Sequence, residues 1–102
     1  MTVFTTFYEE KAQELERNHK EWVSSNKKMR SIELALRQIK TEGDTEITPA
    51  EEVLRKEYEK EKAKNDKICT DMYALKGFVR SMEIEANRHG VTWDRTTEIF
   101  GY

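Results

Sequence analysis

The chain has 102 residues, of which 37% are charged and 36% are hydrophobic, and its net charge is −2 at pH 7. One Pro and four Gly leave little turn chemistry, so the composition predicts a single domain of exposed helices with narrow apolar stripes. The near-neutral charge argues against a generic nucleic-acid binder, and no run approaches the roughly 18 apolar residues of a membrane span.

The first predicted element is a helix over residues 6–40. Thr6 and Glu9 have the spacing of a capping box, although a start one turn earlier, at Thr2, is an alternative. Apolar residues recur at a seven-residue interval along this helix: Tyr8, Leu15, Trp22, Met29 and Leu36. Such an interval places the residues in one seam that must face another helix.

A polar segment at residues 41–47 is predicted to form a turn. The next helix is predicted over residues 49–89, because Thr48 can cap it and Pro49 suits the first helical position. Glu51 completes a second capping box. The short connection makes the two helices antiparallel neighbours.

The second helix carries a matching seam of mostly apolar residues: Leu54, Tyr58, Ile68, Met72, Leu75, Val79, Met82 and Ala86. If the two helices of this chain form an antiparallel hairpin about the turn at 41–47, the numbers of facing residues should sum to about 90. Ser25 then faces Asn65, in a polar layer near Glu61. Gly90 is the expected left-handed terminator of the helix, with Val91 folding back on the last turn.

Residues 91–102 are predicted to form a C-terminal hook, with a short third helix capped by Thr92 or Asp94. Aromatic residues from both ends of the chain gather with this hook at the open end of the hairpin. They either form a small core or present a surface to a partner. The candidate partner-binding residues there are Phe4, Phe7, Trp93, Phe100 and Tyr102.

A second apolar stripe lies on the helix over 49–89, away from the seam. Its candidate contact residues are Tyr73, Gly77 and Ile84. A Gly inside a helix lowers helix stability and often allows another backbone to approach closely. A thin hairpin buries little surface, so we expect two copies to pair into a coiled-coil-like four-helix bundle.

Catalytic and metal-binding patterns are missing from the sequence. His19 and His89 are far apart, Cys69 is the only cysteine, and the glycines stand singly. We therefore expect no enzyme, no cofactor and no metal. The single cysteine and the absence of a signal-peptide pattern at the N-terminus favour a cytoplasmic location.

Basic residues concentrate in the middle of the predicted hairpin. From Arg17 to Arg30 there are five basic residues against one acidic residue. Together with lysines of the second helix they could form a band that contacts phosphates. The residues of this basic band are Arg17, Lys20, Lys27, Lys28, Arg30, Lys60, Lys64 and Lys67. The plainer interpretation is a solvated face crossed by intrahelical ion pairs.

The sequence thus predicts an all-α fold, a long antiparallel helical hairpin with a short C-terminal helix. The leading functional hypothesis is a non-enzymatic protein-interaction module: an adaptor, an inhibitor or an assembly factor, of the kind found among phage and mobile-element accessory proteins. Its partner protein is not identified by the sequence, and a second copy of the chain is an expected partner. The alternative is a nucleic-acid-associated protein that uses the basic band.

Overall fold

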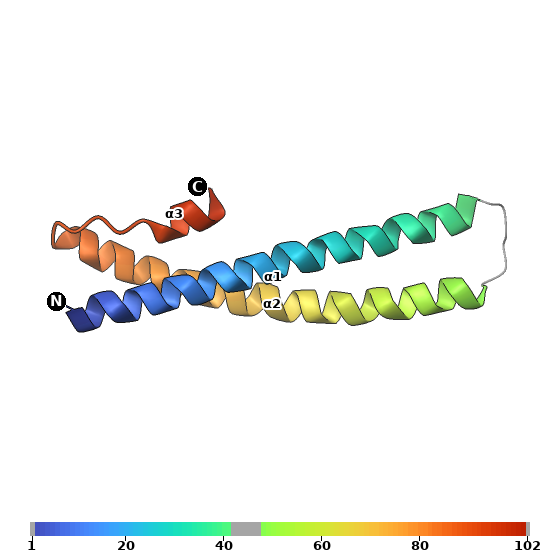
Figure 1. Cartoon of the computed structure of the whole chain (residues 1–102), viewed down its shortest axis with the longest axis horizontal. Coiled ribbons are helices and arrows are strands. Elements are labelled where there is room, and N and C mark those ends of the chain that lie inside the picture. The colour runs from blue at the N-terminus through green and yellow to red at the C-terminus, as the bar shows by residue number, and fades with distance from the viewer. Residues whose placement is uncertain (1, 42–47, 102) are drawn as a thin grey trace.

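Two long antiparallel helices and a short third helix make up the molecule (Figure 1). The computed structural model describes residues 2–41 and 48–101, with side chains from residue 4 to residue 39 in the first segment. Helix α1 spans Thr2–Thr41, α2 spans Pro49–Arg88 and α3 spans Arg95–Phe100. The rod measures 64 × 20 × 14 Å, and its described residues contain no strand, so the all-α hairpin is confirmed.

The start of α1 corrects one prediction. The helix begins at Thr2, one turn before the predicted cap, so Thr6 lies inside it and does not cap it. The reason is tertiary, since the first turn carries Phe4, whose ring stacks on Trp93 of the hook at 5.5 Å between centroids. The predicted turn at 41–47 falls, apart from residue 41, outside the described residues.

Both ends of α2 match the sequence signals. Thr48 Oγ1 accepts a hydrogen bond from the Glu51 amide at 3.1 Å, and Pro49 follows the cap. The helix ends at Arg88 with His89 as its C-cap, within one residue of the predicted bound of 89 and in agreement with the prediction that it ends at Arg88 or His89. Gly90 has φ of 81°, its amide bonds to the Asn87 carbonyl, and the Val91 amide bonds to the Ala86 carbonyl at 3.0 Å. This is a Schellman ending, which turns the chain back toward the hairpin.

The predicted register is also confirmed. Tyr8 bonds to Glu83, Ser25 to Asn65, and Tyr58 to Glu33, so the numbers of paired residues sum to about 90 along the whole hairpin. Seam residues are buried or half-buried throughout, and Ser25 and Glu61 form the polar layer.

The apolar core is concentrated at the open end, where three helices meet. Tyr8, Leu15, Met72, Val79 and Met82 form its buried part. Side chains of all three helices and of the connection before α3 pack around them: Phe4, Trp22, Leu75, Trp93, Ile99 and Phe100. Toward the turn only two helices share the seam, and there the buried apolar side chain among described residues is Ile32.

Candidate functional site

A buried carboxylate ties the hook to the hairpin. Glu83 of α2 is 0% exposed, and its Oε2 accepts hydrogen bonds from the Tyr8 hydroxyl at 2.7 Å and from the Thr96 amide at 3.1 Å. The Thr96 hydroxyl donates to Oε1, and the Arg80 guanidinium lies 3.4 Å from the same oxygen. We call Tyr8, Glu83 and Thr96 the latch. It joins one residue from each helix.

The latch is an anchor rather than a reactive centre. Its carboxylate is closed off from solvent, and donors occupy both of its oxygens. Burial and the hydrogen bond to Glu83 raise the pKa of Tyr8 well above its ordinary value, so this phenol stays neutral. Among the described residues, no group of three His, Cys, Asp or Glu side chains could hold a metal ion.

Aromatic rings surround the latch and account for three of the predicted contact residues. Trp93 stacks on Tyr8 at 4.2 Å and on Phe4 at 5.5 Å between ring centroids. At the far end of α3, Phe100 packs edge-on against His19 at 5.0 Å. Phe4, Trp93 and Phe100 are therefore half-buried, and the hook packs on its own chain. Tyr102 lies outside the described residues.

Other apolar side chains at the open end remain exposed. Phe7 is 42% exposed and Phe78 is 47% exposed, and their rings meet edge-to-face at 6.0 Å. Beside them is a hollow of about 230 Å³, whose wall is mainly apolar. Its lining residues are Phe4, Thr5, Glu85, Ala86, His89, Val91 and Trp93. Phe4 and Phe7 are one helical turn apart, so the ring pair and the hollow lie at the same end of α1, although neither Phe7 nor Phe78 lines the hollow.

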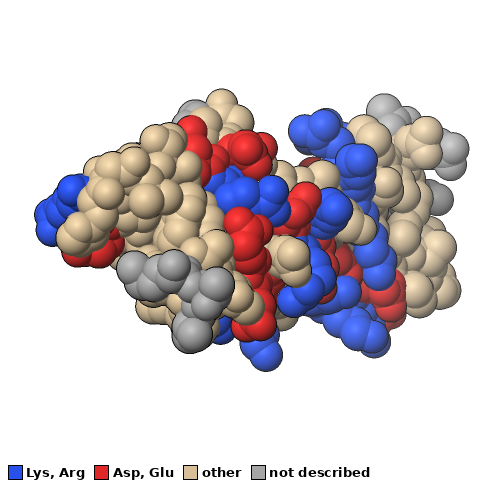
Figure 2. All heavy atoms as spheres, turned by 60° about the vertical axis from the view of Figure 1, so that its left-hand side comes forward, with Lys and Arg blue, Asp and Glu red and all other residues tan. Residues whose placement is uncertain are grey.

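We call Phe4, Phe7, Phe78, Val91 and Trp93 the open-end patch. In Figure 2 the open end lies on the left, and its visible surface carries few charged side chains. Lysine, arginine and acidic side chains alternate instead along the middle of the rod. A side chain from another molecule could enter this hollow, where Glu85 and His89 are the ionisable lining residues and Phe4, Ala86, Val91 and Trp93 are the apolar ones.

The second predicted contact site lies on a different face. Tyr73 is 48% exposed and Ile84 is 45% exposed, on the side of α2 that faces away from α1. A Cβ built on Gly77 would meet nothing within 4 Å. Among the described residues, therefore, no other element packs closely against this glycine.

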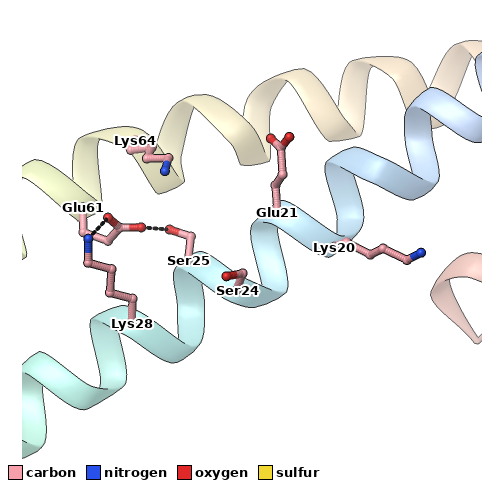
Figure 3. A pocket seen from close by; sticks show the side chains of 7 residues that line it. All are labelled: Lys20, Glu21, Ser24, Ser25, Lys28, Glu61 and Lys64. Carbon is pink, nitrogen blue, oxygen red and sulfur yellow. Dashed lines mark hydrogen bonds and ion pairs between the residues drawn. The ribbon is translucent and has the colours of Figure 1, made fainter.

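Three residues of the basic band lie near the polar layer (Figure 3). Lys20, Lys28 and Lys64 line a surface hollow of about 530 Å³, together with Glu21, Ser24, Ser25 and Glu61. Lys28 Nζ lies 3.3 Å from the buried Glu61 carboxylate. The Ser25 hydroxyl donates a hydrogen bond to the same carboxylate at 2.8 Å. The hydrogen bond from Ser25 and the nearby Lys28 ammonium hold the pKa of Glu61 below its usual range.

The remaining cations of the basic band are exposed but do not share that hollow. Lys27 and Arg30 flank a different depression on α1, beside Val23 and Asn26. Arg17, Lys60 and Lys67 are exposed elsewhere around the rod. On the face seen in Figure 2, basic and acidic side chains alternate, so the predicted cations do not form one continuous basic surface there.

Sequence reasoning missed the latch and part of the open-end patch. Glu83 directly follows the seam residue Met82, where a charged residue normally marks the solvent side of a helix. The available signal was the register, since a sum of about 90 places Glu83 opposite Tyr8. Phe78 and Val91, both exposed, were not among the predicted contact residues.

Comparison of the chain with protein-family models, with curated proteins and with solved structures finds no match. The functional argument therefore depends on the geometry of this chain alone. No helix in the described part of the chain is long and apolar enough to cross a membrane.

Proposed function

We propose that this chain is a non-enzymatic protein-interaction module that binds a partner protein through the open-end patch. The observation that carries the proposal is the exposed pair of Phe7 and Phe78 at the end of the rod that also holds a mainly apolar hollow. Exposed aromatic side chains grouped around a pocket are the usual anchors of protein interfaces, whereas a folded monomer gains nothing from leaving them in water.

The hook supports this role by making the patch rigid. Trp93 forms one wall of the hollow, and its ring is held against Tyr8 and Phe4. The latch fixes the start of α3 directly beyond it. A preformed site loses less conformational entropy on binding, so a small patch of this kind can still bind tightly. An adaptor, inhibitor or assembly factor would use such a site. A cytoplasmic location and a phage accessory role remain predictions.

The test is a differential capture experiment. Tagged wild-type protein and the double variant Phe7→Asp/Phe78→Asp are used to capture proteins from a lysate of the natural host. The matched control is Leu34→Asp/Val53→Asp, which changes two exposed apolar residues far from the open end. We expect a stoichiometric protein that the control retains and the open-end variant loses. Equal capture by all three proteins would overturn the proposal.

The basic band gives a second candidate function, nucleic-acid association. The specific observation is that Lys20, Lys28 and Lys64 line one hollow (Figure 3). The acidic Glu21 and Glu61 in the same hollow offset much of this charge, so we rank it second. Anisotropy of a labelled DNA duplex is the direct measurement. This function requires binding that weakens steeply with salt and that Lys28→Glu/Lys64→Glu abolishes.

Pairing of two chains into a four-helix bundle belongs to the same proposal. The outward face of α2 supports it, because Tyr73 and Ile84 are exposed on the side opposite α1. A pair of chains would present two open-end patches, which allows bivalent binding of a repeated partner.

A further inference from the structure

The outward face of α2 is suited to close contact with another helix. Gly77 lies between the exposed Tyr73 and Ile84, and there is open space where its side chain would be. A glycine in the middle of a helix lowers helix stability relative to alanine. No described residue comes within 4 Å of a Cβ built on Gly77, so this position can admit a close approach from outside the described part of the chain.

The two aliphatic hydroxyls on this face, those of Thr70 and Ser81, are already satisfied within the helix. The Ser81 hydroxyl donates to the Gly77 carbonyl at 2.9 Å, and the Thr70 hydroxyl donates to the Asp66 carbonyl at 3.0 Å. Covering these hydroxyls therefore leaves no donor without an acceptor, and their desolvation costs little. The face from Thr70 to Ile84 can be buried by an apolar surface of similar shape.

The charges at the two ends of this face are opposite and symmetrically placed. Asp66 precedes Gly77 by eleven residues and Arg88 follows it by eleven. Both side chains are exposed, and Arg88 is paired within the helix with the exposed Glu85. At 1.5 Å per residue each charge is about 16 Å from Gly77 along the helix axis.

We propose that the occupant of this face is the same face of a second copy of the chain. The two α2 helices run antiparallel and cross at Gly77. This two-fold arrangement opposes residues whose numbers sum to 154, so that Asp66 of each chain faces Arg88 of the other. Tyr73 of each chain then lies against Ser81 of the other, and Thr70 lies against Ile84. Within residues 66–88 this register opposes no pair of like charges on the face.

The inference depends on the proposed pairing of chains and specifies its register. It does not depend on the open-end patch, because Phe7 and Phe78 lie on another side of the hairpin, in the groove between α1 and α2. The partner-binding proposal can therefore fail while this inference holds, and the reverse is also true.

Charge reversal tests the register, with sedimentation equilibrium of the full chain as the measurement. In a dimer of the Asp66→Arg variant, an arginine faces an arginine at both contacts between positions 66 and 88. In a dimer of Arg88→Asp, an aspartate faces an aspartate at both contacts. Each variant should dimerise roughly tenfold more weakly than the wild type. A double variant that carries both changes should recover wild-type affinity. The matched control is Asp71→Arg, an exposed aspartate five residues from Asp66 and on another side of α2.

A mixture of the two single variants gives the sharpest result. One chain then has arginine at both positions and the other has aspartate at both, so both opposed pairs are attractive in the heterodimer alone. Native mass spectrometry should show the heterodimer well above its statistical share. A steric test is Gly77→Leu, which favours the helix but blocks the crossing: circular dichroism should show that it is folded, and sedimentation equilibrium should show that it is a monomer.

Three results would overturn the proposal. The wild-type chain could stay monomeric at all accessible concentrations, which would also remove the pairing of chains from the proposed function. Dimers could form that Asp66→Arg weakens no more than Asp71→Arg does. Finally, Arg88→Asp could weaken the dimer while Asp66→Arg does not, which would mean that Arg88 faces another residue and that the register is different.

Discussion

At the residue scale, Glu83 determines how the hook is attached. Moving a carboxylate out of water is costly unless hydrogen bonds replace its solvation. Here the Tyr8 hydroxyl and the amide and hydroxyl of Thr96 supply those bonds, one donor coming from α1 and two from α3. The carboxylate therefore favours the docked hook over any arrangement in which either helix moves away.

Glu83→Ala should destabilise the protein by about 3 kcal/mol, because it leaves the Tyr8 hydroxyl and the Thr96 amide buried without acceptors. Urea unfolding followed by circular dichroism measures the free energy of unfolding. The control is Glu85→Ala, an exposed position two residues away, which should change stability by less than about 0.5 kcal/mol. Equal losses in the two variants would contradict the anchoring role of the latch.

Because of Tyr8, we expect the folded protein to lose stability in alkaline solution. Its pKa is raised in the folded state, so folded protein binds the phenolic proton more tightly than unfolded protein does. The resulting stability is complete below the ordinary tyrosine pKa of about 10 and is lost progressively as the pH rises above it. We expect the free energy of unfolding to fall more steeply above this pH in the wild type than in Tyr8→Phe. Parallel curves for the two proteins would show that Tyr8 is not responsible.

At the element scale, two glycines of the α2 segment have opposite roles. Gly90 has φ of 81°, a conformation that strains an L-residue, whereas Gly77 is helical with open space around it. The sequence signals predicted both ends of α2 because caps and terminators act locally, through hydrogen bonds within one turn. At the start of α1 the capping-box signal at Thr6 was misleading, because the helix begins at Thr2, the alternative start, and its first turn carries Phe4, which stacks on Trp93.

Alanine at these two positions should therefore have opposite effects in dilute protein, where copies do not pair. Gly90→Ala should lower the free energy of unfolding by about 1 kcal/mol, because it forces a Cβ into the left-handed region. Gly77→Ala should raise it by about 1 kcal/mol through helix propensity. Thermal unfolding is the measurement, and a loss of stability in Gly77→Ala would mean that the glycine is needed within the folded monomer.

At the scale of the whole molecule, stability is expected to be uneven along the rod. Three helices share the buried cluster around Leu15, Met72 and Val79, while near the turn two helices share a seam of half-buried side chains. Local opening is cheapest where the least apolar area is buried. The open end is thus the rigid part of the molecule, which suits it for binding.

Native-state hydrogen exchange followed by mass spectrometry tests this gradient. Amides of residues 29–36 and 54–61 should exchange at least about tenfold faster than those of residues 8–15 and 72–82. Uniform protection along both helices would show that the hairpin opens only as one unit. In that case the hook would contribute stability to the whole rod rather than to its own end.

Much of this architecture follows from the sequence alone. The seven-residue interval that includes Tyr8, Leu15 and Trp22 determined which faces meet, and a single short connection determined that the helices run antiparallel. With those two facts the register could be predicted, and the bond between Ser25 and Asn65 confirms it. These features are local or periodic, so neighbouring residues carry the information.

Only the tertiary structure decided which aromatic residues are used internally and which are left exposed. Phe4 and Trp93 stack within the chain while Phe7 and Phe78 stay exposed, although all four have similar chemistry and lie at the same end. The difference depends on where α3 docks. The docking of α3 depends in turn on the Glu83 carboxylate of α2, which accepts a hydrogen bond from the Thr96 amide. Periodicity cannot reveal such a choice, because the contacts that make it join residues far apart in the chain.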